Sequence, residues 1–206
     1  SDYSLLDGAQ RVDQLVNTID DLNMDSLALT EHGNMFSVLP FYKQAKNAGI
    51  NPIIGCETYV AVGSRHDKKP AAGGGWGNNH LILLVQNQTG YQNLMKLVTA
   101  GYLEGFYYRP RIDMGLLEKY SEGLICLSGC LKGEIPEKML NGDYEGAKNA
   151  ALKFSEIFSD RFYLEVQNHG IPEEEANIVN MKKLSEDLSL PLVCTNDAHY
   201  SKKEHS

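Results

Sequence analysis

Side chains of types that bind metal ions follow several short apolar segments of this 206-residue chain, or lie inside them. Short segments rich in Ile, Leu and Val are typical of strands buried on both faces of a parallel sheet. The carboxyl ends of such strands open on one face, where binding sites are assembled. We therefore expect these side chains to meet at one mouth: Glu31 and His32 after SLALT, Glu57 inside IIGCETYV, Cys130 after GLICLS, His169 after FYLEV, and Asp197 and His199 after PLVCT.

The chemistry of this set is that of a divalent metal centre. Imidazole, carboxylate and thiolate together suit Zn²⁺, with Mn²⁺ and Fe²⁺ as competitors. Two such ions about 3.5–4 Å apart are a recurrent arrangement for phosphate-ester hydrolysis, since they activate water and neutralise phosphoryl oxygens. Each residue alone has an ordinary alternative: a loop histidine is more often only hydrogen-bonded, and Cys130 alone would be a small buried hydrophobe. The metal hypothesis therefore depends on the co-location of the set.

His80 is the exception, because it precedes the apolar segment Leu81–Gln86. Either that strand begins earlier than its apolar run, or a loop returns His80 to the mouth. The preceding stretch, Gly63–Asn79, contains PAAGGGWGNN. Glycine loses much entropy in regular structure, so this stretch is predicted to be a surface loop or lid.

Apolar periodicity predicts helices that alternate with the strands. A helix over residues 35–48 should end at Gly49, because glycine is typical just beyond a helix terminus. The alternation predicts an α/β fold, either a barrel or a doubly wound parallel sheet. The expected strands are 26–30, 53–61, 81–86, 123–128, 161–166 and 191–195, and the expected helices are 10–22, 35–48, 90–103, 113–120, 134–140, 144–158 and 172–188.

The composition is that of one compact globular domain, with 42% hydrophobic and 22% charged residues. Nineteen Lys and Arg oppose 27 Asp and Glu, which gives a formal net charge of −8. Such an acidic domain does not by itself bind a phosphate backbone, so bound cations or other segments must supply positive charge. The four cysteines form no CxxC pair, and no signal peptide or membrane span is recognisable. We therefore expect a reduced, cytoplasmic protein that does not enter a membrane.

Eight segments point to a known family: SDYSLLDGAQR, ALTEHGNMF, PIIGCETYV, HLILL, TGYQNLMKLV, FYYRPRID, GLICLSGC and TNDAHY. In this order they resemble the polymerase and histidinol phosphatase (PHP) domain at the amino terminus of the alpha subunit of bacterial DNA polymerase III. The likeness runs from Ser1 to Ser206 and implies a single PHP domain over 1–206, with the fold of a distorted seven-stranded β/α barrel. It also implies up to three divalent ions, zinc or manganese, at the carboxyl ends of the strands.

Carried over residue by residue, the resemblance implies metal ligands and catalytic residues. Glu57 would bridge ions, and Glu31 stands where the family has Asp beside the ligand His32, which implies a supporting role. Asp7 is assigned only by the resemblance, since its alternative is a helix N-cap. The implied ligands are Asp7, His32, Glu57, His80, Cys130, Asp197 and His199, and the residues implied to take part in catalysis are Glu31, His32 and Asp197.

In the family, a first strand with a His-x-His motif lies immediately before the segment that resembles SDYSLLDGA. We therefore expect this sequence to lack two ligands and one barrel strand. No polymerase palm or fingers are represented, so DNA polymerisation is not expected of these residues.

The resemblance implies removal of nucleotides from DNA 3′ ends, as a proofreading exonuclease embedded in a polymerase. The implied partners are DNA, the remaining polymerase domains and other replicase subunits. Two alternatives stay open: a scaffold whose metals only rigidify it, and a small-molecule phosphatase of the histidinol-phosphatase kind. Arg109 and Arg111 could clamp a phosphate, or could be ordinary exposed or interface arginines.

Overall fold

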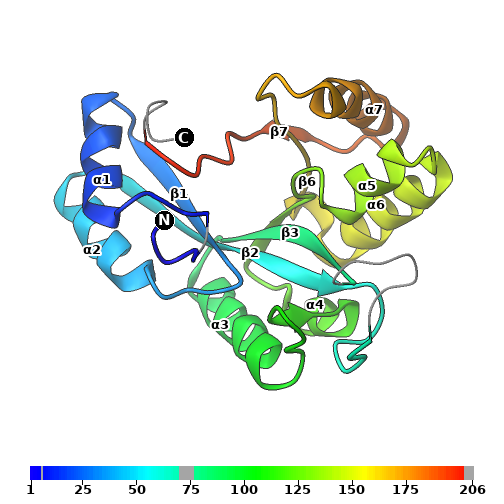
Figure 1. Cartoon of the computed structure of the whole chain (residues 1–206), viewed down its shortest axis with the longest axis horizontal. Coiled ribbons are helices and arrows are strands. Elements are labelled where there is room, and N and C mark those ends of the chain that lie inside the picture. The colour runs from blue at the N-terminus through cyan, green and yellow to red at the C-terminus, as the bar shows by residue number, and fades with distance from the viewer. Residues whose placement is uncertain (6, 70–76, 202–206) are drawn as a thin grey trace.

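A curled sheet forms the centre of the computed structural model, which describes residues 1–5, 7–69 and 77–201 (Figure 1). The strand order is β1-β2-β3-β5-β6-β7, and the short β4 pairs with β2. No described strand pairs with the outer edge of β1 or of β7, so the sheet is a half-barrel that stays open between these edges. The strands are β1 (Ser26–His32), β2 (Asn51–Ala61), β3 (Asn78–Val85), β4 (Arg111–Ile112), β5 (Leu124–Leu127), β6 (Phe162–Val166) and β7 (Leu192–Cys194).

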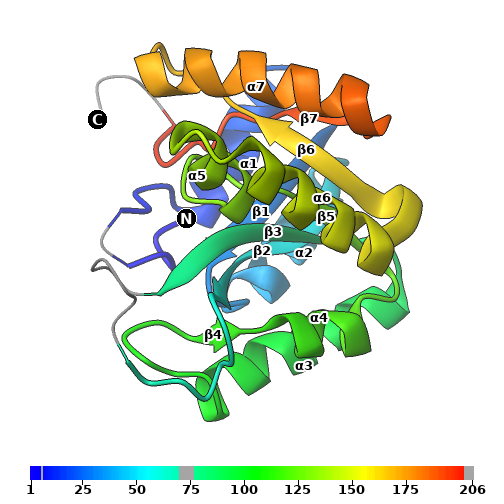
Figure 2. The same ribbon diagram turned by 90° about the vertical axis from the view of Figure 1, so that its right-hand side faces the viewer.

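Helices surround the outer side of the curled sheet. The first two helices lie beside β1 and β2, the next two lie below the sheet in the view of Figure 1, and the last three cover β5, β6 and β7 (Figure 2). No helix of the described residues is both long and apolar enough to cross a bilayer. The helices are α1 (Val12–Asp21), α2 (Val38–Asn47), α3 (Gln88–Leu103), α4 (Met114–Tyr120), α5 (Glu134–Leu140), α6 (Tyr144–Phe158) and α7 (Pro172–Leu188).

Two apolar cores hold these helices against the strands. The larger core joins the sheet to α3–α7 and contains the buried side chains of Leu83 and Phe154. The smaller core joins α1, α2 and β1 and contains Leu15, Ile19 and Phe41. Each fully buried side chain of this size contributes roughly 1.5–3 kcal/mol. Of the apolar positions at helical spacing in the helix expected over 10–22, Val12, Leu15, Val16 and Ile19 are buried in α1, whereas Leu22 lies beyond the helix end and is 62% exposed.

Helix termini fix where the chain leaves the strands. Asn87, just after β3, accepts a hydrogen bond from the Gly90 backbone N–H at 3.0 Å and caps α3. Asp113, just after β4, caps α4 in the same way. Such caps satisfy backbone donors that would otherwise lack partners. At the other end of α2, Gly49 has a φ of +76°, as its predicted terminal position requires.

The predicted α/β fold of a distorted barrel is confirmed in the form of a half-barrel, but the prediction of parallel strands throughout is wrong for β3. This strand runs antiparallel to both β2 and β5. Apolar patterns report burial and not direction, so the sequence could not show this reversal. The two-residue β4 was not predicted at all. Of the predicted loop over 63–79, Asn78 and Asn79 belong to β3, and residues 70–76 lie outside the described residues.

Candidate metal centre

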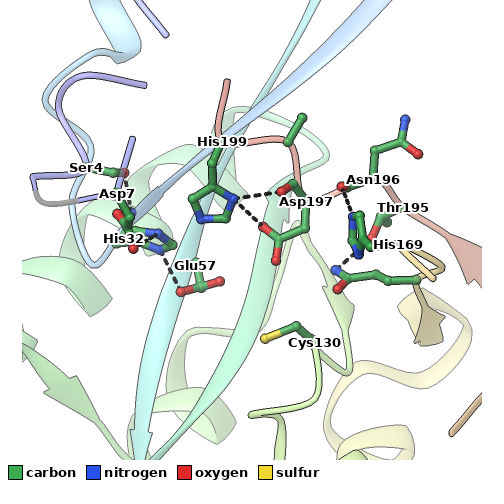
Figure 3. A network of polar contacts seen from close by, with 12 residues as sticks. Ser4, Asp7, His32, Glu57, Cys130, His169, Thr195, Asn196, Asp197 and His199 are labelled. Atoms are coloured by element: carbon green, nitrogen blue, oxygen red, sulfur yellow. Dashed lines mark hydrogen bonds and ion pairs between the residues drawn. The ribbon is translucent and has the colours of Figure 1, made fainter. Parts of the chain in front are cut away.

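Ligand-type side chains meet at the mouth of the half-barrel (Figure 3). His32 is the last residue of β1 and lies opposite Glu57 of β2 in the parallel register. His80 lies near the start of β3. Because β3 is antiparallel to β2, its amino end lies beside the carboxyl ends of the parallel strands. His80 therefore reaches the mouth as a residue of β3 itself, because this strand begins at Asn78 and runs antiparallel to β2. No returning loop is needed.

Glu57, His80 and Cys130 form a first ligand group, in which the candidate ligand atoms all lie within 4.8 Å of one another. His80 Nδ1 lies 3.1 Å from Glu57 Oε1 and 3.6 Å from Cys130 Sγ. Glu57 pairs with Ile82, two residues beyond His80, so Glu57 and His80 share one face of the sheet. Two neighbouring strands and the turn after β5 thus converge on one point.

Asp7, His32 and His199 form a second ligand group with the same spacing limit of 4.8 Å. His32 Nε2 lies 3.2 Å from Asp7 Oδ2, and the rings of His32 and His199 have centroids 5.4 Å apart. His32 Nδ1 donates to Glu57 Oε1 at 2.7 Å. Glu57 therefore links the two groups. Asp7 does not cap α1, whose N-cap residue is Arg11 without a side-chain cap.

The chain beyond β7 supplies the last two predicted ligands. His199 Nδ1 lies 2.8 Å from the Asp197 carbonyl oxygen and 3.8 Å from Asp197 Oδ1. Asp197 belongs to neither ligand group of the described residues. Its φ of +43° is a strained value for a residue with a Cβ. Backbone pairing between the Ala9 N–H and the His199 carbonyl, at 2.9 Å, holds this segment beside the one that carries Asp7.

A cavity of about 590 Å³ adjoins these residues and is lined by strands of the sheet, by α1 and by the segments before α1 and after β7. His32, Glu57, Cys130, Asp197 and His199 line its polar part. Its remaining wall is largely apolar and is contributed by strands of the sheet. A volume of this size is in the range of small-ligand sites. Five of the seven predicted ligands therefore line a space that a substrate group could enter.

The charges of the centre depend on contacts as well as burial. Burial alone would raise the pKa of Glu57, but hydrogen bonds from His32 and His80 hold that pKa at about 2. The bond with Glu57 raises the pKa of His32, against the effect of burial. Burial raises the pKa of the Cys130 thiol to about 12, so Cys130 is protonated unless a cation replaces the proton.

The donor set fits a divalent cation. Imidazole, a buried carboxylate and a thiol converge in the first group, and a carboxylate and two imidazoles converge in the second. Two carboxylates, Asp7 and Glu57, approach the same imidazole, and such crowding is relieved by bound positive charge. Mixed nitrogen, oxygen and sulfur donors are ligands of transition-type ions rather than of Mg²⁺ or Ca²⁺.

Glu31 lies on the opposite side of β1 from His32, as the alternation of a strand requires. Its side chain is 1% exposed and accepts hydrogen bonds from the hydroxyls of Ser4 and Ser37. The Ser4 hydroxyl also accepts from the His32 backbone N–H at 3.0 Å. Glu31 therefore holds the segment that carries Asp7 against β1, and the structure does not bring it to the ligand groups.

The two candidate phosphate-binding arginines differ in position. Arg111 is 2% exposed, and its guanidinium donates to the carbonyl oxygens of Gly105, Arg65 and Asp67. Its proposed phosphate contact is therefore corrected: Arg111 is a structural residue, because burial and these bonds enclose its charge. Arg109 is exposed, and its Cζ lies 5.5 Å from the ring centroid of Tyr59.

His169 lies near the centre but binds protein atoms. Its Nδ1 lies 2.7 Å from Glu174 Oε1, and its Nε2 donates to the Asn196 carbonyl oxygen at 2.6 Å. The bond to Glu174 raises the pKa of His169. Burial would raise the pKa of Glu174, but the bonds from His169 lower it. The pair therefore positions the segment after β7.

We expect this pair to stabilise the fold most between about pH 4.5 and 6.5, the ordinary values of its two groups. His169 has a raised pKa, so its contribution is complete below pH 6.5 and is lost as the pH rises through the folded value. Glu174 has a lowered pKa, so its contribution is lost as the pH falls below 4.5. Urea unfolding of the parent and of His169→Gln should differ by less than about 1 kcal/mol, because the histidine is partly exposed. A difference that stays constant from pH 5 to 8 would contradict this assignment.

Three supporting residues were not predicted from the sequence. Ser4 carried no signal. The Tyr59 ring lies 5.3 Å from the His80 ring, and its position two residues after Glu57 on a strand could have indicated the shared face. Glu165 is an acid inside the apolar segment FYLEV, which is a detectable anomaly because an unpaired carboxylate is costly to bury.

The chain is similar in sequence to subunits of known proteins. The chain is 50% identical to the DNA polymerase III subunit alpha of Borreliella burgdorferi over 204 residues, 99% of this chain and 18% of that protein. It is 47% identical to the corresponding subunit of Treponema pallidum and 44% identical to that of Thermus aquaticus, covering 18% and 17% of those proteins. The chain thus spans less than a fifth of the length of the curated relatives it matches.

Two solved structures share the fold at 11% sequence identity. One is a candidate metal-dependent phosphoesterase from Bifidobacterium adolescentis, with a TM-score of 0.54 over 96% of this chain and 85% of that one. The other is an amidohydrolase from Chromobacterium violaceum with bound sulfate, with a TM-score of 0.55 over 94% of this chain and 84% of that one.

The model of the PHP domain matches residues 1–169, which include Asp7, His32, Glu57, His80 and Cys130. The family match therefore covers both ligand groups except for His199. We conclude that this chain belongs to the PHP domain family.

Proposed function

We propose that residues 1–206 form a metal-dependent phosphoesterase domain of a bacterial replicative DNA polymerase, which removes nucleotides from DNA 3′ ends. The observation that carries this proposal is Glu57, which belongs to one ligand group and whose Oε1 contacts His32 of the other, beside a cavity. Two adjacent cation sites with a common carboxylate suit phosphoester hydrolysis. Similarity to replicative polymerases favours DNA over a small phosphomonoester as the substrate.

Zn²⁺ or Mn²⁺ would be held by Glu57, His80 and Cys130 in one group and by Asp7, His32 and His199 in the other, with up to three ions in all. Bound divalent ions would supply an activated water and positive charge for the phosphoryl oxygens. Three ions and one deprotonated thiol would change the formal charge from −8 to −8 − 1 + 6 = −3. The ions would thus reduce the repulsion between this acidic domain and DNA.

The other proposed roles follow from position. We assign proton acceptance to Asp197, because its side chain lines the cavity without belonging to either ligand group. His32 contacts both Glu57 and Asp7, so it would fix the position of one ligand group relative to the other. Glu31 would act indirectly, by holding the segment that carries Asp7. Arg109, lying over the Tyr59 ring, would bind a DNA phosphate beside the reacting one.

A second candidate function is a docking module for the rest of a polymerase, and an exposed aromatic patch favours it. Phe36, Tyr102 and Phe106 are 65%, 39% and 47% exposed. Their rings are neighbours, with centroids 6.4 Å apart for Phe36 and Tyr102 and 6.1 Å apart for Tyr102 and Phe106. Contiguous exposed apolar surface often marks an interaction site. Further polymerase domains, other replicase subunits and DNA would be the partners, in the cytoplasm where bacterial DNA lies.

The test compares substrates under one set of conditions. We expect the chain, loaded with Mn²⁺ or Zn²⁺, to shorten a 5′-labelled single-stranded oligonucleotide from its 3′ end, and His32→Ala and Asp197→Ala to lose this activity. Histidinol phosphate should be a poor substrate. Glu156→Gln, an exposed change on α6, is the control.

The outcomes separate the three functions. Metal binding without hydrolysis of any substrate would support the docking module. Turnover of the phosphomonoester with none on DNA would support the small-molecule phosphatase. Hydrolysis of DNA ends by the two alanine variants at the parental rate would refute the nuclease assignment.

A further inference from the structure

β6 and the residues after it carry three polar side chains at alternate positions, Glu165, Gln167 and His169, which we call the β6 polar row. Alternate positions of an extended chain share one face. All three side chains contact the segment just after β7: Glu165 and Gln167 contact Thr195, and His169 contacts Asn196. The row therefore lies beside the segment that leads to Asp197 and His199. Figure 3 shows His169 next to Asn196 of that segment.

Of the three side chains in this row, Glu165 also contacts the loop after β5, which carries Cys130. Its Oε2 accepts from the Gly129 backbone N–H at 3.0 Å, and its Oε1 accepts from the Thr195 hydroxyl at 2.5 Å. Gln167 Nε2 donates to the same Oε1 at 3.3 Å. Gly129 directly precedes Cys130, and Thr195 is two residues before Asp197. One buried carboxylate thus joins the two loops that carry candidate ligands from β5 and β7.

We propose that Glu165 is a positioning residue of the metal centre, which sets the loop carrying Cys130 and the segment carrying Asp197 and His199 relative to each other. This inference rests on the proposed metal-dependent function. Glu165 is 3% exposed and belongs to neither ligand group, so it acts through its neighbours. Residues that hydrogen-bond near metal ligands commonly control their orientation.

The local geometry explains why a carboxylate is needed. Both oxygens accept hydrogen bonds from groups on different loops, and an amide would turn donor hydrogens toward one of them. Gly129 is itself confined: its φ is +84°, and a Cβ there would lie 2.6 Å from the His80 carbonyl oxygen. The Gly129 N–H therefore has a fixed direction, and Glu165 meets it from the strand β6.

The test uses Co²⁺, whose absorption reports the ligands directly. Parent, Glu165→Gln and Thr195→Val are titrated with Co²⁺, and the thiolate-to-cobalt charge-transfer band reports whether Cys130 is bound. We expect Glu165→Gln to weaken Co²⁺ binding about 10–100-fold and to weaken the band, as for other residues that support metal ligands. Thr195→Val removes the hydroxyl's bonds with Glu165 and Gln167 but leaves the Gly129 bond in place, so it should weaken binding less and keep the band. Glu186→Gln, the same substitution at an exposed position of α7, should bind like the parent.

Urea unfolding of each variant separates positioning from folding. A Glu165→Gln protein that is less stable but binds Co²⁺ with parental affinity and an unchanged band would overturn the inference, while the proposed metal function would stand. If Glu165→Gln does not fold, the Co²⁺ affinity of Thr195→Val is the test instead. An affinity below that of the parent supports the inference, and an affinity equal to that of the parent overturns it. A parent that binds no Co²⁺ would overturn the proposed function, and this inference with it.

Discussion

Replacement of Glu57 by glutamine is expected to abolish hydrolysis of DNA ends and to lower the affinity for Zn²⁺ or Mn²⁺ by more than about 100-fold, the upper range for residues that merely support a ligand. The side chain keeps its shape in this variant but loses the charge that both His32 and His80 contact, at 2.7 and 3.1 Å. Because Glu57 is a candidate ligand of one group and contacts His32 of the other, its loss should affect both sites at once.

Competition with a chromophoric chelator measures the affinity, and release of labelled nucleotides measures hydrolysis. Glu156→Gln makes the same chemical change on the exposed side of α6 and should retain both properties. Parental metal affinity in Glu57→Gln would show that the shared carboxylate is not a ligand. Retained affinity with lost hydrolysis would instead restrict its role to the reaction.

Metal ions are expected to raise the thermal stability of the chain strongly. The ligands come from segments far apart in the sequence, from Asp7 to His199, so the unfolded chain cannot present them together. At a free concentration 1,000 times Kd, an ion that binds only the folded state adds about 4 kcal/mol. For a domain of this size, that corresponds to a rise in Tm of roughly 8–16 °C.

Thermal unfolding with Zn²⁺, with Mn²⁺ and with excess chelator measures this effect. The rise should vanish on chelation and should be much smaller in Glu57→Gln, which lacks the carboxylate that contacts both His80 and His32. Equal Tm values with metal and with chelator would contradict the existence of the centre. The ion that produces the larger rise at equal free concentration is the one the site binds more tightly.

Local patterns predicted the helices and most of the strands, because burial repeats with the period of each element. α1 illustrates this: the apolar positions Val12, Leu15, Val16 and Ile19 are all buried in the structure. Strand direction was beyond such patterns, since an apolar run has the same spacing in both directions. The apparent misplacement of His80 in the sequence was the one visible sign that β3 is reversed.

The candidate site shows a similar division. Six of the seven predicted ligands, all except Asp197, fall into the two ligand groups, because their residue types and their places relative to strands are sequence properties. The burial of an individual charged side chain, in contrast, could not be predicted from the sequence. Arg111 and Arg109 are two residues apart in YYRPRID, yet Arg111 is enclosed by backbone carbonyls and Arg109 is exposed. Glu165 likewise depends on hydrogen bonds to residues 36 positions before it and 30 positions after it.

The open side of the half-barrel affects how this chain behaves in concentrated solution. Strands β1 and β7 each have an outer edge to which no described strand is paired. Backbone amides and carbonyls on such edges recruit strands from neighbouring molecules. We therefore expect preparations of these residues to self-associate through strand addition as concentration rises.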